Sequence, residues 1–173
     1  MQHQTQLEQI QSFYRALRAV PGATADLTGS EDYPAIRGTV LFYQTTAGVL
    51  VTVRVTGLPH GQDGCAAPVF ALHIHSGPLC RGDREDPFKD AMTHYNPGDC
   101  DHPHHAGDLA PLFGNHGDAF SVMLTDRFPV REIIGRAVII HLNPDDFTTQ
   151  PAGNAGKKIA CGLIRQTRRF GNG

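Results

Sequence analysis

The sequence lacks the features that would place it in a membrane or on a nucleic acid. No stretch of its 173 residues is long and apolar enough to span a bilayer. The net charge is −2, so the chain offers no basic surface to a polyanion. Residues 1–20 are polar and mixed, without the apolar segment of a secretory signal. These absences predict a cytoplasmic protein, unless a signal has been removed and the location is extracytoplasmic.

Paired cysteine motifs are also missing. None of the four cysteines forms a C-x-x-C pair, which excludes zinc-ribbon and thioredoxin-like motifs. The even count permits one or two disulfides, and these would favour an oxidising compartment. No internal repeat is present, and the length fits one domain with a substantial core. The cysteines are Cys65, Cys80, Cys100 and Cys161.

The N-terminal segment differs from the rest of the chain. Residues 5–20 place apolar side chains at helical spacing, and Pro21 and Gly22 then stop the helix. We expect this amphipathic helix to pack on the body of the protein or on a partner subunit. The apolar positions are Leu7, Ile10, Tyr14 and Leu17. The pattern divides the chain into a helical extension, residues 1–22, and a main domain, residues 23–173.

Short strands dominate the main domain. With 19 glycines and 12 prolines, it alternates brief β-branched segments with turns, and residues 46–48 form a hairpin turn between two of them. Two unequal loops, residues 77–107 and 144–156, lack periodicity, which is typical of functional loops. We predict an all-β fold, an eight-stranded Greek-key β-barrel or sandwich of immunoglobulin-like type. The predicted strands are residues 23–29, 36–45, 49–58, 69–76, 109–113, 119–125, 137–142 and 158–164.

Histidines are concentrated in and just before the first long loop. Six of the ten lie between His73 and His105. His73 and His75 are two apart on a predicted strand, so their imidazoles share one face. Residues 93–109 add four histidines, broken by proline and glycine unlike an affinity tag. Imidazoles and carboxylates suit Zn, Cu or Fe. The alternatives are a solvated polar loop and a satisfied polar patch.

Several separated motifs together resemble the copper/zinc superoxide dismutase family. They occur in the family's order between about residues 23 and 164. The motifs are His73-Ile-His75, Cys80, His94-Tyr-Asn-Pro, His105-Ala-Gly-Asp108-Leu, Ile134-Gly-Arg-Ala-Val-Ile-Ile-His141 and Gly153-Asn-Ala-Gly-Lys-Lys-Ile-Ala-Cys161-Gly.

The resemblance implies two metal sites that share one residue. It assigns copper to His73, His75, His94 and His141. It assigns zinc to His94, His102, His105 and Asp108, with His94 bridging the metals. Asp145 corresponds to the carboxylate that orients one histidine of each site. Cys80 and Cys161 correspond to the family's intrasubunit disulfide.

The activity implied is conversion of superoxide to dioxygen and hydrogen peroxide, with copper cycling between Cu(II) and Cu(I). His94 would take up and release the proton. Lys158 stands where the family has an arginine that docks the anion, so it keeps the charge but loses the planar fork. The alternative is a non-catalytic relative that binds or stores copper. Such a relative should lack a copper histidine, and none is missing here. Many family members are dimers, so a homodimer is allowed.

Two assignments stay open at this point. The middle zinc ligand is His102 or His104, and we favour His102. The i, i+3 spacing of His102 and His105 lets both rings converge, whereas neighbours in an extended segment point apart. Cys65 and Cys100 have no counterpart in the usual family pattern. They form a second disulfide or are two free buried thiols.

Overall fold

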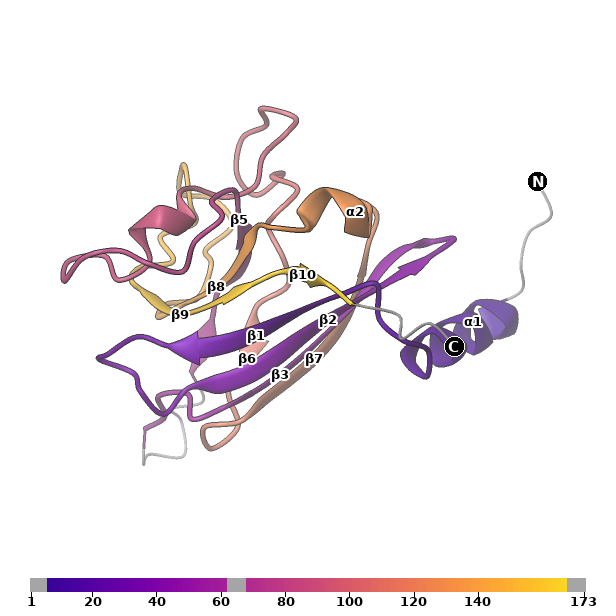
Figure 1. Ribbon diagram of the computed structural model, residues 1–173, viewed down its shortest axis with the longest axis horizontal. Coiled ribbons are helices and arrows are strands. Elements are labelled where there is room, and N and C mark those ends of the chain that lie inside the picture. The colour runs from indigo at the N-terminus through magenta and orange to yellow at the C-terminus, as the bar shows by residue number, and fades with distance from the viewer. Residues whose placement is uncertain (1–5, 62–67, 168–173) are drawn as a thin grey trace, which may run out of the picture.

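The computed structural model describes residues 6–61 and 68–167, and a curled antiparallel sheet dominates it (Figure 1). The strand order is β5-β8-β9-β1-β2-β3-β7, with β10 beside β1, and a separate two-stranded sheet pairs β4 with β6. The strands are β1 Ala23–Gly29, β2 Arg37–Thr45, β3 Gly48–Thr56, β4 Val69–Phe70, β5 Leu72–His75, β6 Leu112–Phe113, β7 Ala119–Thr125, β8 Ala137–His141, β9 Lys158–Leu163 and β10 Arg165–Gln166. The all-β prediction is confirmed, in the form of a half-barrel whose edges are β5 and β7.

The predicted strand over residues 69–76 is interrupted at Ala71. Its two halves pair with different partners, since Val69 lies opposite Phe113 of β6 and Leu72 lies opposite Ile140 of β8. The strand expected at residues 109–113 is correspondingly reduced to Leu112–Phe113. This single apolar segment therefore contributes a strand to each of two sheets. Its hydrophobic pattern alone does not indicate the division.

Three short elements were not predicted. Helix α2 (Val130–Ile133) follows Pro129 and buries Val130 and Ile133, three residues apart on one face. Strand β10 continues the chain beyond β9 and pairs with the start of β1. A 3-10 turn, η1 (Lys89–Ala91), lies in the first long loop. These elements are too short to show a sequence period.

Helix α1 (Gln6–Leu17) forms as expected but projects from the barrel (Figure 1). None of its residues is buried, and Leu7, Ile10 and Tyr14 are 64, 55 and 62 % exposed. The apolar side chains of the helix are therefore not buried against the body of the chain. Packing on a partner subunit stays a prediction. No helix in the described ranges is long and apolar enough to cross a membrane.

The core fills the inside of the curled sheet, and a smaller cluster lies on the outside of β8 and β9. Strand β8 belongs to both, because Val138 and Ile140 enter the main core whereas Ala137 and Ile139 face outward. The outward pair packs under the first long loop, against Phe88 and η1. This layering holds the loop on the outer face of β8, where His141 also lies at the strand end.

Candidate metal centre

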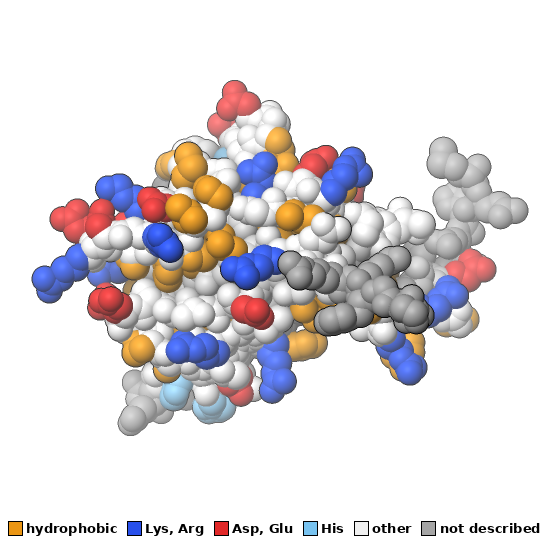
Figure 2. Space-filling model, viewed as in Figure 1, with side chains coloured by type: hydrophobic (Ala, Val, Ile, Leu, Met, Phe, Trp, Pro, Cys, Tyr) orange, Lys and Arg blue, Asp and Glu red, His pale blue; other side chains and the backbone are white. Residues whose placement is uncertain are grey.

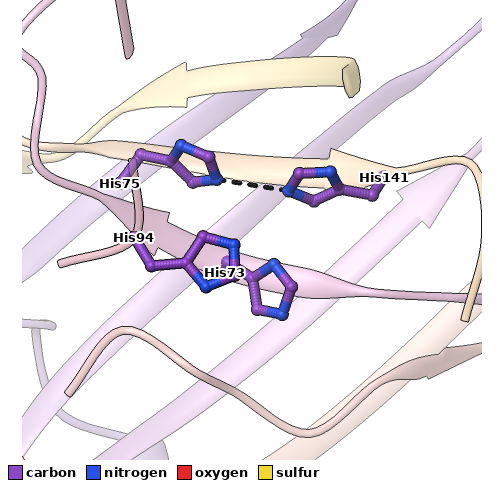
Figure 3. A group of neighbouring side chains, drawn as sticks. All are labelled: His73, His75, His94 and His141. Carbon is purple, nitrogen blue, oxygen red and sulfur yellow. Dashed lines mark hydrogen bonds between the residues drawn. The ribbon is translucent and has the colours of Figure 1, made fainter. Parts of the chain in front are cut away.

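Four histidines from three parts of the chain converge beneath the long loops (Figure 3). Strand β5 directs Leu72 and Ile74 into the core, so the alternate residues His73 and His75 face the opposite way. His94 lies beside this strand through a bridge with His75, and His141 ends the neighbouring strand β8. One nitrogen of each ring lies within 4.8 Å of the others, and all four residues are buried.

Hydrogen bonds at the outer ring nitrogens fix how these imidazoles point. His75 Nδ1 donates to the Met92 carbonyl at 2.8 Å, and His141 Nδ1 donates to the Gly156 carbonyl at 3.1 Å. Their Nε2 atoms then face each other at 3.2 Å. His73 Nδ1 and His94 Nε2 are buried without a hydrogen-bond partner among the described residues. Unpaired buried nitrogens are costly unless a ligand satisfies them, so the arrangement fits a metal.

A second group shares His94 with the first. Its Nδ1 lies 2.8 Å from Asp108 Oδ1 and 3.3 Å from His105 Nδ1. His102 Nδ1 lies 3.0 Å from Asp108 Oδ2 but has no hydrogen bond in the described structure. The members of the group are His94, His102, His105 and Asp108, all buried. His104 is exposed and outside both groups, so the structure places His102 in the middle position.

The protonation states match what metal ligands require. Burial lowers the pKa of His73, holds that of His75 well below its usual value and lowers that of His141 to about 3. Burial acts to raise the pKa of Asp108, but the hydrogen bond and charges of the surrounding histidines outweigh it and lower the pKa. At neutral pH these groups are therefore neutral imidazoles and a carboxylate.

Asp145 connects the two groups from behind. Its Oδ2 accepts a 2.8 Å hydrogen bond from His73 Nε2, and its Oδ1 accepts one of 2.8 Å from His102 Nε2. Phe147 N donates to the same Oδ1 at 2.7 Å. Burial acts to raise the pKa of Asp145, but these three hydrogen bonds hold it well below its usual range. Because Asp145 binds the Nε2 atoms of His73 and His102, the Nδ1 atom of each ring is left to face the other ligands of its group.

Comparison with known proteins identifies the family. The family described as "Copper/zinc superoxide dismutase (SODC)" matches residues 36–164. The chain is 33 % identical to superoxide dismutase [Cu-Zn] 2 of Aquifex aeolicus over 159 residues, covering 83 % of this chain and 86 % of the relative. It is 31 % identical to superoxide dismutase [Cu-Zn] of Deinococcus radiodurans over 163 residues, covering 84 and 85 %. The chain belongs to the copper/zinc superoxide dismutase family.

Solved structures agree with this assignment. The copper/zinc superoxide dismutase of Brucella abortus superposes with a TM-score of 0.69 at 25 % identity, covering 82 % of this chain and 98 % of the other. A double mutant of a superoxide dismutase-like protein from Bacillus subtilis gives a TM-score of 0.66 at 26 % identity, covering 82 and 96 %. The family match over residues 36–164 includes both histidine groups.

The residues fit the two metals of a superoxide dismutase. Four imidazoles suit both oxidation states of copper, so His73, His75, His94 and His141 form the copper site. Three imidazoles and one carboxylate suit tetrahedral zinc, so the group containing Asp108 forms the zinc site. His94 belongs to both groups: its Nδ1 lies beside Asp108, and its Nε2, buried without a hydrogen-bond partner among the described residues, would be available to copper.

Replacing Asp145 with asparagine is expected to weaken both metal sites. The amide loses the negative charge, and the NH2 group that replaces one carboxylate oxygen cannot accept the hydrogen bond of the imidazole that it faces. We expect affinity for zinc and copper to fall about 10- to 100-fold, measured by competition with a chromophoric chelator. Asp146→Asn is the matched control, because Asp146 is exposed and its carboxylate, among the described residues, accepts hydrogen bonds from Thr148 and Thr149 of its own turn and from neither metal group. Equal affinities in both variants would refute the orienting role.

Gly153 leaves the space that Asp145 occupies. Its φ is +62°, and a Cβ there would overlap Asp145 Oδ1 and lie 2.7 Å from His102 Nε2. Gly135 has a similar φ of +83° but nothing within 4 Å of its Cβ position. Gly153→Ala and Gly135→Ala should each cost about 1 kcal/mol of unfolding free energy from backbone strain. Only Gly153→Ala should also weaken zinc binding in a chelator titration, and equal zinc affinities would contradict this.

Two polar side chains, which the sequence analysis did not predict, hold the backbone of residues 102–108, the segment that carries three of the zinc ligands. Arg127 Nη1 donates to the carbonyls of Pro103, His105 and Asp108 at 3.1, 3.2 and 3.1 Å. Gln150 accepts from His102 N at 3.0 Å and donates to His102 O at 2.7 Å. Both contacts join segments far apart in the sequence, so no local motif signals them. They fix the backbone on which the zinc ligands stand.

The cysteine predictions have separate outcomes. The disulfide between Cys80 and Cys161 is present and joins the first long loop to β9, which confirms the prediction. Cys100 is exposed and is a free thiol, so both the predicted disulfide with Cys65 and the alternative of a buried thiol are wrong for Cys100. Cys65 itself lies outside the described residues.

Proposed function

We propose that this chain consumes superoxide catalytically at the site formed by His73, His75, His94 and His141. The observation that carries the proposal is that both sets of ligands are complete and share His94. Copper, when bound, supplies the one-electron oxidation and reduction that turn two superoxide ions and two protons into dioxygen and hydrogen peroxide. The protein has to hold the ligands, admit a small anion and deliver protons.

His94 is the residue we propose to carry a proton. Its Nε2 faces the copper ligands without a hydrogen-bond partner among the described residues. Its Nδ1 is held beside Asp108 and His105, so the ring keeps its orientation while Nε2 gains or loses the proton. His75 and His141 are fixed through their Nδ1 atoms and keep Nε2 directed inward.

Lys158 is the residue we propose to attract superoxide. It lies opposite His141 in the β8–β9 pairing, which places a positive charge next to a copper ligand. Exposed Lys157 is a second cation beside it. Arg136 is less suited to this task, because its guanidinium lies 3.8 Å from the ring centre of Tyr95 and donates to Ser76 O. A lysine supplies attraction without the bidentate geometry of an arginine.

A copper-binding or copper-storage protein is the second candidate. The four intact copper histidines favour the enzyme, because a non-catalytic relative should lack at least one. Stopped-flow mixing with a large molar excess of superoxide separates the two. The enzyme consumes many equivalents per copper and forms one dioxygen and one hydrogen peroxide from two superoxide ions. A storage protein would react with about one equivalent and then stop.

We further propose that the chain is a homodimer. Apolar side chains exposed on β7 and β6 support an interface there: Phe113, Phe120, Val122 and Leu124 are 71, 73, 44 and 43 % exposed. Light scattering gives the solution mass, and Phe120→Glu should shift a dimer toward monomer. A monomeric mass for the unaltered chain would reject the homodimer.

The cytoplasmic location stays a prediction, which cell fractionation with activity staining would test.

A further inference from the structure

Lys158 does not present a free charge to the site. Its Nζ lies 2.6 Å from Asp86 Oδ2 and 3.3 Å from the Phe88 carbonyl. The Lys158 side chain is 14 % exposed and that of Asp86 is 38 % exposed. The pair joins β9 to the first long loop, six residues after Cys80 and three residues before Cys161, the two ends of the disulfide. The loop therefore places a carboxylate directly on the cation beside His141.

Asp86 is held in this position by its own turn. Its Oδ1 accepts a 3.1 Å hydrogen bond from Phe88 N, which leaves Oδ2 for Lys158. Its backbone N donates to Asp83 Oδ1 at 2.9 Å, and its carbonyl accepts from Lys89 N at 3.1 Å. The buried side chain of Phe88 packs against Cys161 in the outer cluster. A carboxylate fixed in this way loses little further side-chain entropy when it pairs.

The pairing alters the field that an approaching anion meets. A lone lysine adds one positive charge, but a lysine with a carboxylate at contact distance is a dipole with no net charge. Lys89 of the same loop is also paired with an acid, its Nζ lying 3.1 Å from Asp83 Oδ2. Figure 2 shows basic and acidic side chains intermixed over the end of the molecule at the left of the view.

We infer that Asp86 sets the rate at which small anions reach the copper site, by neutralising most of the charge of Lys158. The inference rests on the proposed role of Lys158 in attracting superoxide. Asp86 acts through Lys158 and is a positioning residue with no contact to the substrate. It makes the chain a superoxide dismutase whose anion attraction is restrained by an acid on its own loop.

Asp86→Asn tests this, because asparagine keeps the acceptor for Phe88 N and removes the charge. We expect azide, monitored by the change in Cu(II) absorption when it binds the copper-loaded protein, to bind about two- to fourfold more tightly at low ionic strength. The rate constant with superoxide should rise by a similar factor, and both gains should shrink in concentrated salt. Glu85→Gln is the matched control, since it removes one charge from the next, exposed position.

Lys158→Met separates failure of this inference from failure of the proposed role of Lys158. We expect Lys158→Met to weaken azide binding, and Asp86→Asn to have no further effect in that background. If Asp86→Asn tightens azide binding no more than Glu85→Gln, or weakens it, the inference about Asp86 is wrong. If Lys158→Met leaves azide binding and the superoxide rate unchanged, the role of Lys158 is wrong. Copper and zinc content and the melting temperature of each variant show that it is folded and loaded.

Discussion

His141→Ala is expected to lower superoxide consumption to the spontaneous rate while the chain still binds one zinc. His141 supplies one of four imidazoles to the copper site and none to the zinc site. Its Nε2 lies 3.2 Å from that of His75, so alanine leaves a gap in the centre of the copper ligands. The zinc ligands are held independently by Arg127 and Gln150.

The measurement is a superoxide assay combined with metal analysis of the same preparation. His104→Ala is the matched control, because His104 is exposed and belongs to neither metal site. It should keep both metals and full activity, whereas His102→Ala should lose zinc. Substantial activity in His141→Ala, or loss of its zinc together with its copper, would show that the ligands are divided differently.

Replacing both Cys80 and Cys161 with serine should produce the largest loss of stability. The disulfide closes a loop with a sequence separation of 81, which corresponds to about 4 kcal/mol in the chain-entropy account. The two cysteines also pack with Phe88 and Ile139 in the outer cluster, so their loss loosens the first long loop. That loop carries Asp86 and His94, and metal affinity should fall with stability.

Urea denaturation of the metal-free protein measures this effect without the contribution of bound metals. The oxidised unaltered chain and the Cys80→Ser/Cys161→Ser variant should differ by several kcal/mol in unfolding free energy. Cys100→Ser is the control, since Cys100 is an exposed free thiol, and it should change the unfolding free energy little. A double serine variant as stable as Cys100→Ser would mean that the disulfide contributes nothing.

Sequence reasoning found those parts of the fold that depend on local pattern. The hairpin of β2 and β3 and the shared face of His73 and His75 follow from period-2 alternation. The preference for His102 over His104 followed from the directions in which neighbouring side chains point. The break at Ala71 could not be predicted from local pattern, because it arises where the chain changes from one partner strand to another.

The supporting contacts of the site depend on tertiary structure. Arg127, Gln150 and Asp86 each reach a segment at least 19 residues away, and nothing near them in the sequence marks that contact. The division of ligands between two metals came from the resemblance to the family. The structure adds the physical reason, because the two nitrogens of His94 face different groups of ligands.

The most direct test of the account is superoxide consumption measured as copper is added to zinc-loaded protein. Activity should rise in proportion to bound copper and level off at one copper per chain, with zinc constant at one per chain. The His141→Ala variant should show no rise at all. A fully copper-loaded chain that leaves superoxide at its spontaneous rate, or activity that does not depend on copper, would contradict the assignment of this site as the catalytic centre.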